Sequence, residues 1–135
     1  MKSADRTARA QLSGGSIGMA LLLSDGEGIT LAREADRLLD NASRPDVTAI
    51  LSLGDKIGRM TDGLDSFGTF LLQALVARIR ARAHVRTAGL HLWVECLNQL
   101  EASFRRSSAL YLEPRQTVLS AARMLAVTSR RAGAL

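Results

Sequence analysis

The chain has 135 residues, 47% of them hydrophobic, which is enough for one helical domain with a core of its own. Its net charge is +5, no apolar run approaches the roughly 20 residues that cross a bilayer, and residues 1–12 lack the apolar segment of a signal peptide. A single cysteine, Cys96, excludes an internal disulfide and fits a reducing compartment, so we expect a cytoplasmic protein without membrane contact.

The composition favours helices throughout the chain. Aromatic residues make up only 4% of it, and the runs of Val, Ile, Thr, Tyr and Phe that would indicate strands are missing. Leu, Ala, Val, Ile and Met must therefore build the core, and such a composition is typical of helical proteins. We expect an all-α fold, a bundle of about five helices preceded by two short ones.

Glycines, prolines and capping residues set the expected helix ends. Gly14 and Gly15 separate the first two helices, Pro45 prevents the third from continuing, and Asp46 can cap the fourth. Pro114 suits the first turn of the last helix, where its missing N–H would have no partner. The predicted helices cover residues 4–12, 17–24, 28–42, 47–60, 66–86, 89–107 and 114–131.

Apolar residues at helical spacing predict the buried faces of four of the five longer helices. The expected core residues are Ile29, Ala32, Ala35, Leu38, Leu39, Val47, Ile50, Leu51, Ile57, Phe67, Phe70, Leu71, Ala74, Leu75, Ile79, Leu90, Trp93, Val94, Leu97, Leu100 and Phe104. The stretch Asp25-Gly26-Glu27-Gly28 is polar and glycine-rich, so we place a domain boundary there, between residues 1–27 and 28–135.

Residues that could carry catalysis or hold a metal are scarce. The histidines His84 and His91 form no known ligand pattern with Cys96, and a metal site needs three or four ligands. Cys96 lies in an apolar stripe and fits a small core residue better than a nucleophile. A phosphate-binding glycine loop ending in Gly-Lys-Ser/Thr is absent. We therefore expect a protein that is not an enzyme, uses no cofactor and acts on no small-molecule substrate.

One segment near the N-terminus, residues 13–23, reads Ser-Gly-Gly-Ser-Ile-Gly-Met-Ala-Leu-Leu-Leu. On the residues alone it is a loop followed by a short buried helix capped by Ser16. The pattern Gly15-Ser16-x-x-x-Ala-Leu also resembles the sensor 2 helix in the lid domain of AAA+ ATPases. In clamp-loader ATPases an Arg usually stands two residues after this Ser and reaches the nucleotide phosphates. Gly18 holds that place here and cannot do so. Such a degenerate sensor 2 resembles that of the delta-prime subunit of the bacterial DNA polymerase III clamp loader.

Two later stretches carry the same resemblance. Leu92-Trp93-Val94-Glu95 is similar to the start of the penultimate helix of delta-prime subunits. The run from Leu110 to Gln116 is similar to the Asn-Leu-Asp-Arg-Lys-Gln run that opens their last helix, and it departs from that run by having Tyr111, Glu113 and Pro114. The resemblance covers most of the chain.

The resemblance implies an assembly role. Residues 1–27 would end an AAA+ lid domain, and residues 28–135 would form the helical collar through which clamp-loader subunits make their ring. It implies the ATP-hydrolysing gamma/tau subunits and the delta subunit as partners, contact with DNA only through the complex, and no ATP hydrolysis by this chain. The candidate interface residues are Trp93, Leu112, Arg115, Gln116 and Arg123. For Trp93, packing within the core is the alternative.

The positive charge is concentrated in the C-terminal half. Residues 1–77 hold eight Lys and Arg against ten Asp and Glu, whereas residues 78–135 hold ten Arg against three Glu. A small basic helical protein that binds nucleic acid is therefore the alternative function. Its phosphate contacts would come from Arg78, Arg80, Arg82, Arg86, Arg105, Arg106, Arg130 and Arg131. No turn is followed by a polar recognition helix, which speaks against a helix-turn-helix protein.

Overall fold

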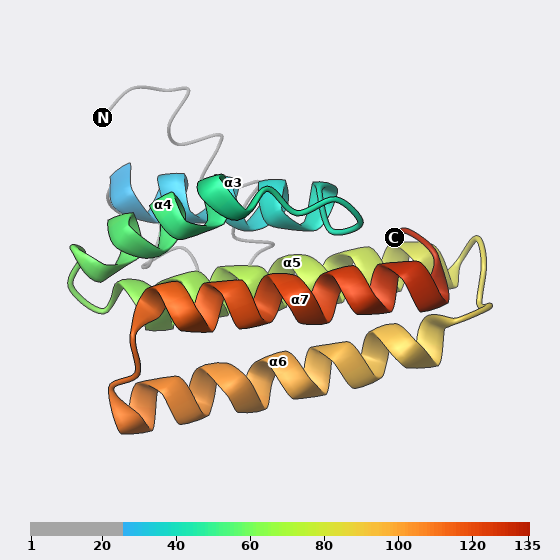
Figure 1. Cartoon of the computed structure of the whole chain (residues 1–135). Coiled ribbons are helices and arrows are strands. Elements are labelled where there is room, and N and C mark those ends of the chain that lie inside the picture. The colour runs from blue at the N-terminus through green and yellow to red at the C-terminus, as the bar shows by residue number, and fades with distance from the viewer. Residues whose placement is uncertain (1–25) are drawn as a thin grey trace.

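The computed structural model describes residues 26–135, which form five α-helices labelled α3 to α7 (Figure 1). The all-α bundle of about five helices expected from the sequence is confirmed. The two short helices expected before residue 25 lie outside the described residues, and so does the sensor-2-like segment Gly15, Ser16 and Gly18.

The first two described helices run in opposite directions. α3 spans Gly26–Asp40 and begins inside the stretch where the sequence predicts a linker, with Gly28 already buried. α4 spans Val47–Gly58, and Asp46 caps it as predicted: its carboxylate accepts a hydrogen bond from the backbone N–H of Ala49 at 3.2 Å. The division into two domains stays a prediction, because nearly all of the first domain lies outside the described residues.

Three longer helices complete the bundle. α5 spans Gly63–Ala83, α6 spans Leu90–Leu110 and α7 spans Pro114–Ala132. α5 begins before the predicted residue 66, because Asp62 takes a left-handed conformation (φ 52°) and turns the chain at Gly63. A Cβ atom on Gly63 would clash with the carbonyl oxygen of Ile57, so a glycine is needed where α5 begins against the end of α4.

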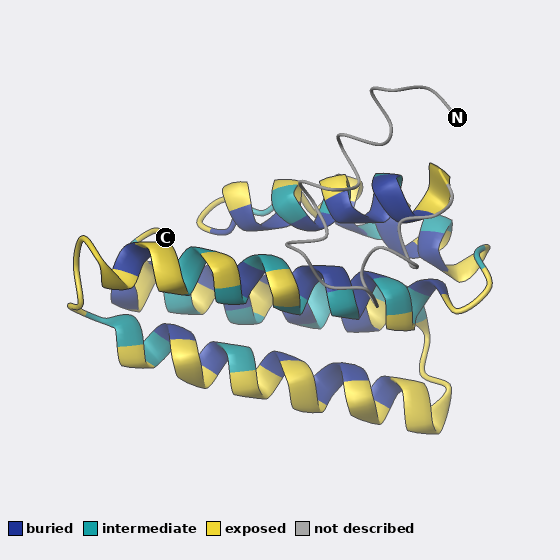
Figure 2. Cartoon of the chain, turned by 180° about the vertical axis from the view of Figure 1, so that it is seen from behind, coloured by how far each residue is buried: buried dark blue, intermediate teal, exposed yellow. Residues whose placement is uncertain are grey.

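The bundle is built around α5 and α7, which run in the same direction through its middle (Figure 1). α6 packs against both of them on one side, while α3 on α5 and α4 on α7 cover the other side. Figure 2 shows the consequence for burial: the inward faces of the helices are buried and the outward faces are exposed. The α6–α7 connection lies at one end of the bundle, and the α5–α6 loop and the C-terminus lie at the other end.

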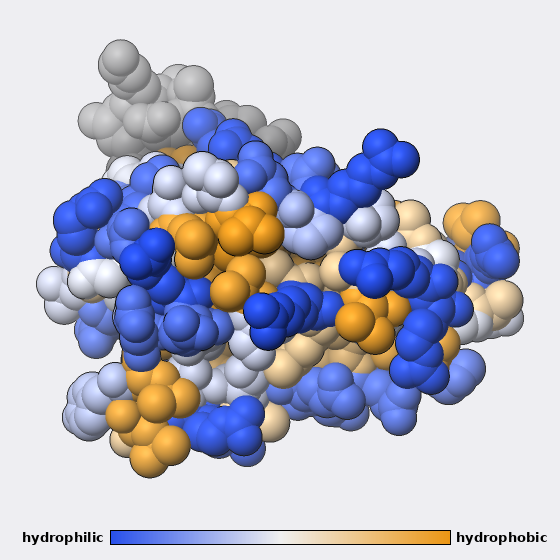
Figure 3. Space-filling view, viewed as in Figure 1, coloured by the Kyte–Doolittle hydropathy of each residue, from blue (hydrophilic) through white to orange (hydrophobic). Residues whose placement is uncertain are grey.

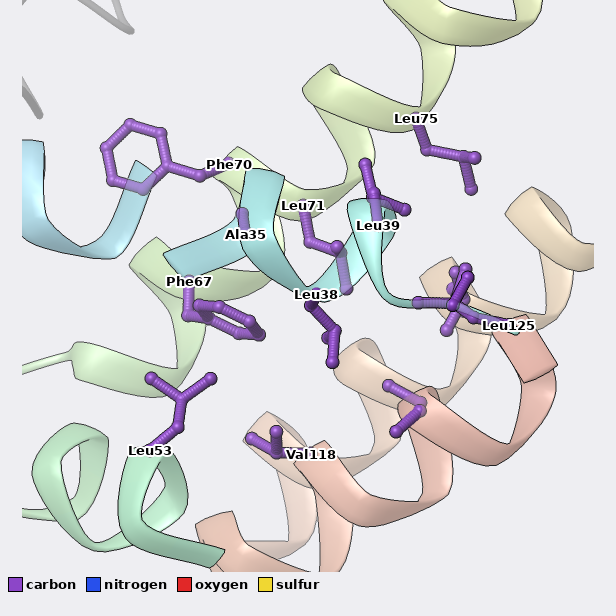
Figure 4. Packing of buried hydrophobic residues seen from close by; sticks show 14 of the residues in the cluster. Ala35, Leu38, Leu39, Leu53, Phe67, Phe70, Leu71, Leu75, Val118 and Leu125 are labelled. Carbon is purple, nitrogen blue, oxygen red and sulfur yellow. The ribbon is translucent and has the colours of Figure 1, made fainter. Parts of the chain in front are cut away.

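The core joins all five helices. Figure 4 shows side chains from four of them pointing toward one another: Ala35, Leu38, Leu39, Leu53, Phe67, Phe70, Leu71, Leu75, Val118 and Leu125. The predicted core residues of α3 are all buried, as are Trp93, Leu100 and Phe104 of α6. Residues 51, 74, 79, 90 and 97 are half-buried.

Two core predictions are wrong. Val47 and Val94 are exposed. Val47 is the first residue of α4, whose buried face instead follows Ile50, Leu53 and Ile57 onto α7. Val94 lies about 100° around α6 from the buried Trp93, a rotation that turns its side chain outward.

Two glycines allow neighbouring helices to approach closely. A Cβ atom on Gly54 of α4 would lie 2.6 Å from the Cα of Arg115 in α7. One on Gly68 of α5 would lie 2.9 Å from the ring of Phe104 in α6. The ring of Phe104 thus packs over Gly68 and also meets Phe67, with ring centroids 6.2 Å apart. The absence of side chains at these two crossings sets the spacing between the helices.

Arg82, in the last turn of α5, is the one buried charged residue of the described chain. Its Nη2 donates to the carbonyl oxygens of Ala88 and Ala132, both at 2.7 Å. Its Nη1 donates to Gly133 at 3.0 Å and Ala134 at 2.9 Å. One guanidinium therefore ties the end of α5 to the loop before α6 and to the end of α7. Trp93, only 1% exposed, adds a hydrogen bond from its indole N–H to the carbonyl of Gly133 at 3.0 Å.

We predict that Gly54→Ala destabilises the bundle by about 1–3 kcal/mol, because the new methyl group meets the backbone of Arg115 rather than a side chain that can move. Urea unfolding followed by circular dichroism measures the change. Gly58→Ala, at the exposed end of the same helix, is the matched control. Its Cβ would meet only Pro114 at 3.7 Å, so the substitution raises stability by about 0.4–1 kcal/mol. Equal effects of the two substitutions would contradict the close crossing.

Candidate assembly surface

The connection between α6 and α7 exposes three consecutive residues, Leu110, Tyr111 and Leu112, which we call the corner. Their exposed fractions are 62%, 94% and 43%. The corner has a fixed backbone: Tyr111 is left-handed (φ 52°), and the N–H of Leu112 donates to the carbonyl of Ser107 at 3.0 Å. Large side chains are therefore presented to solvent from an ordered turn between two helices.

A shallow hollow of about 260 Å³ lies beside the corner. Its lining includes Met60, Leu64, Tyr111, Leu112 and Pro114. Figure 3 shows a hydrophobic patch on the surface where α6 ends. Exposed apolar groups gathered in one place mark sites of association more often than scattered ones do.

The sequence prediction missed most of the corner because it ended the penultimate helix at residue 107, whereas α6 continues to Leu110. Only Leu112 was a candidate interface residue. The signal that could have revealed the corner is the Leu-Tyr-Leu run directly before Glu113 and Pro114. Three large side chains in succession are unusual in the connection between two helices, where glycine and short polar residues are common.

The outward face of α7 continues from the corner. Gln116, Arg123 and Val127 are exposed on it, and their spacing of seven and four residues places them along one side of the helix. No ion pair of the described residues involves Arg123. Gln116 and Arg123 are therefore exposed to solvent, and their place at an interface stays a prediction.

Arg115 has a role within the chain. Its Nε lies 3.3 Å from Oδ1 of Asp55 in α4, an ion pair without hydrogen-bond geometry, and its backbone crosses Gly54. Substituting Arg115 would disturb the α4–α7 crossing as well as any external contact.

Trp93 lies inside the bundle, not on its surface. Its side chain is almost completely buried, and its N–H bonds to a carbonyl of the same chain. Of the two roles considered for it, the structure favours core packing.

The eight arginines offered for nucleic acid fall into three sets of three, four and one. Three are engaged within the chain: Arg78 pairs with Asp36 and Asp40 at 3.4 and 2.8 Å, Arg82 is buried, and Arg105 pairs with Glu101. Four more lie at the end of the bundle where α5 and α7 finish: Arg80, Arg86, Arg130 and Arg131. The last, Arg106, lies by itself near the end of α6.

Groups suited to catalysis stay apart. In the described part of the chain no three His, Cys, Asp or Glu residues gather closely enough to hold a metal ion. His84 and His91 are exposed, whereas Cys96 is buried in α6. Burial raises the pKa of the Cys96 thiol, and a hydrogen bond with Thr128 opposes part of that rise.

None of the five described helices has the length and apolar character needed to cross a bilayer.

Comparison with known proteins found no matching family model, curated protein or solved structure. The resemblance to delta-prime subunits rests on the short runs quoted from the sequence. The corner and the outward face of α7 include the run from Leu110 to Gln116, so here one of those runs coincides with an exposed surface of the structure.

We predict that the Cys96 thiol of the folded protein resists alkylation by iodoacetamide and reacts in urea. Its folded-state pKa is raised, so the folded state holds the thiol proton more tightly than the unfolded state. This contribution to stability is complete below the unfolded thiol's pKa and is lost as the pH rises through the folded-state pKa. Unfolding free energies measured across the alkaline range should therefore fall more steeply in the wild type than in Cys96→Ala. Identical slopes, or rapid alkylation of the folded protein, would contradict this burial.

Proposed function

We propose that the chain is a non-catalytic assembly module, corresponding to the collar of a delta-prime-like subunit of the DNA polymerase III clamp loader. In this role it holds the loader ring together for sliding-clamp loading during DNA replication in the cytoplasm. Its partners are the gamma/tau and delta subunits. It hydrolyses no ATP and binds no cofactor or small-molecule substrate.

The observation that carries the proposal is the corner. Tyr111 is almost fully exposed at an ordered turn, with leucines on both sides and a hollow beside it. Tyrosine supplies a large contact area for little loss of conformational entropy, and it is enriched among the residues that dominate binding energy at interfaces. A neighbouring subunit that covers the corner would remove this apolar surface from water.

The outward face of α7 adds a positive charge, that of Arg123, to the surface that includes the corner. Arg123 lies beyond Gln116 on the helix that begins at the corner. A guanidinium without an ion-pair partner among residues 26–135, such as that of Arg123, can bind a carboxylate of a neighbour through two parallel hydrogen bonds. An apolar anchor with a charged rim is the common arrangement of protein–protein interfaces.

We predict that Tyr111→Asn combined with Leu112→Ser weakens binding to purified gamma/tau subunits by about 10- to 100-fold. Asparagine tolerates the left-handed conformation at position 111, and both side chains are exposed, so the unfolding free energy should change by less than about 1 kcal/mol. Isothermal titration calorimetry measures the dissociation constant.

Val85→Ser is the matched control, because Val85 is 88% exposed in the α5–α6 loop, at the end of the bundle opposite to the corner. It should bind gamma/tau subunits as tightly as the wild type. Failure of the wild type to bind gamma/tau or delta subunits would refute the proposed function. Equal affinities of wild type and double variant would refute the role of the corner.

A further inference from the structure

Four arginines without a partner lie at the end of the bundle opposite to the corner: Arg80, Arg86, Arg130 and Arg131. We call this group the cationic end. All four are exposed, and none takes part in an ion pair of the described residues. They come from the last turns of α5 and α7 and from the loop after α5.

Arg82 holds the backbone segments that carry these arginines at one end of the bundle. It bonds to the carbonyls of Ala88 and Ala132, which lie within two residues of Arg86, Arg130 and Arg131 in sequence. The α5–α6 loop also touches the end of α7 directly, since a Cβ atom on Gly89 would lie 2.9 Å from the carbonyl oxygen of Ala132. Figure 1 shows the C-terminus at the same end of the bundle as this loop. The cationic end therefore rests on a fixed framework.

The protein's own chemistry does not account for this charge. Cations in a last turn stabilise a helix by offsetting the partial negative charge of its free carbonyls. At the end of α7, however, Arg82 already bonds the carbonyl of Ala132, the last residue of the helix, and those of the two residues that follow it. The carboxylates of Asp36 and Asp40 are paired with Arg78. The four arginines of the cationic end thus remain free to meet an external anion.

The shape of this end favours a long polyanion over a small phosphate ligand. The hollow beside the C-terminus measures only about 120 Å³, and its lining includes Arg78, Trp93 and Leu135 but none of the four arginines. Arginine binds phosphate oxygens in bidentate geometry, and several separated arginines match successive phosphates of a backbone.

If the polyanion is a nucleic acid, the position of the aromatic residues indicates whether it is single- or double-stranded. Proteins that bind single strands stack bases on exposed aromatic rings. Trp93 is buried, and Tyr111 lies at the other end of the bundle. We propose that the cationic end binds the phosphate backbone of duplex DNA without reading its bases. This contact is independent of the assembly surface, since the two lie at opposite ends of the molecule.

The test is the salt dependence of binding to a fluorescein-labelled duplex of about 20 base pairs, measured by anisotropy between about 50 and 200 mM salt. Three to four phosphate contacts predict a slope of about −3 to −4 in a plot of log affinity against log salt concentration. Arg86→Gln, Arg130→Gln and Arg131→Gln together should reduce the size of the slope by about 2–3 units.

The matched control removes three exposed arginines elsewhere, with Arg33→Gln, Arg59→Gln and Arg106→Gln, and so lowers the net charge equally. Its slope should change by less than about one unit. The proposal is overturned if both triple variants lose affinity equally, if the wild type does not bind the duplex, or if single strands bind more tightly. Binding to phosphatidylserine vesicles but not to the duplex would also overturn it, in favour of a membrane surface.

Discussion

A single buried guanidinium, that of Arg82, holds together the end of the bundle where three helices meet. Its four hydrogen bonds all go to backbone carbonyls, and no carboxylate of the described chain lies within ion-pairing distance. Carbonyls at the end of a helix carry partial negative charge and lack partners within the helix. Arg82 supplies a partner to the carbonyl of Ala132, the last residue of α7, and its other three acceptors lie in the loop before α6 and in the segment after α7. Trp93 also donates a hydrogen bond to one of these carbonyls, that of Gly133, and its ring is buried in the core.

This arrangement separates the molecule into two ends with different surface chemistry. At the Arg82 end, exposed arginines from α5, α7 and the loop after α5 form the cationic end, for which we propose a phosphate backbone as ligand. At the other end, α6 turns through Tyr111 into α7 and exposes the apolar corner, which fits a protein neighbour. α7 connects the two ends and presents Arg123 between them. A subunit with these properties could join a protein ring through the corner while touching a duplex at the far end.

Local patterns were sufficient to predict the helices, because each depends on neighbouring residues: Asp46 caps α4, Pro114 begins α7, and the apolar stripe of α3 is wholly buried. Features that depend on contacts distant in sequence were not predictable in the same way. Arg82 was counted among possible phosphate ligands, because nothing near it in sequence indicates that residues 132–134 return to it. Leu110 and Tyr111 were not candidate interface residues, because the penultimate helix was expected to end at residue 107 and no glycine marks the left-handed turn at Tyr111. The exposure of Val47 likewise follows from how α4 is placed on α7.

The most direct test of this account is the unfolding free energy of Arg82→Met, which keeps a long apolar side chain but removes all the donors. Trp93, the only tryptophan of the chain and a neighbour of the same carbonyls, provides the fluorescence signal for urea unfolding. Because three carbonyls would lose their donor and the carbonyl of Gly133 would keep only the indole N–H of Trp93, we predict a loss of about 3–5 kcal/mol relative to the wild type. A loss below about 1 kcal/mol would show that water satisfies these carbonyls and that Arg82 does not hold the helix ends together.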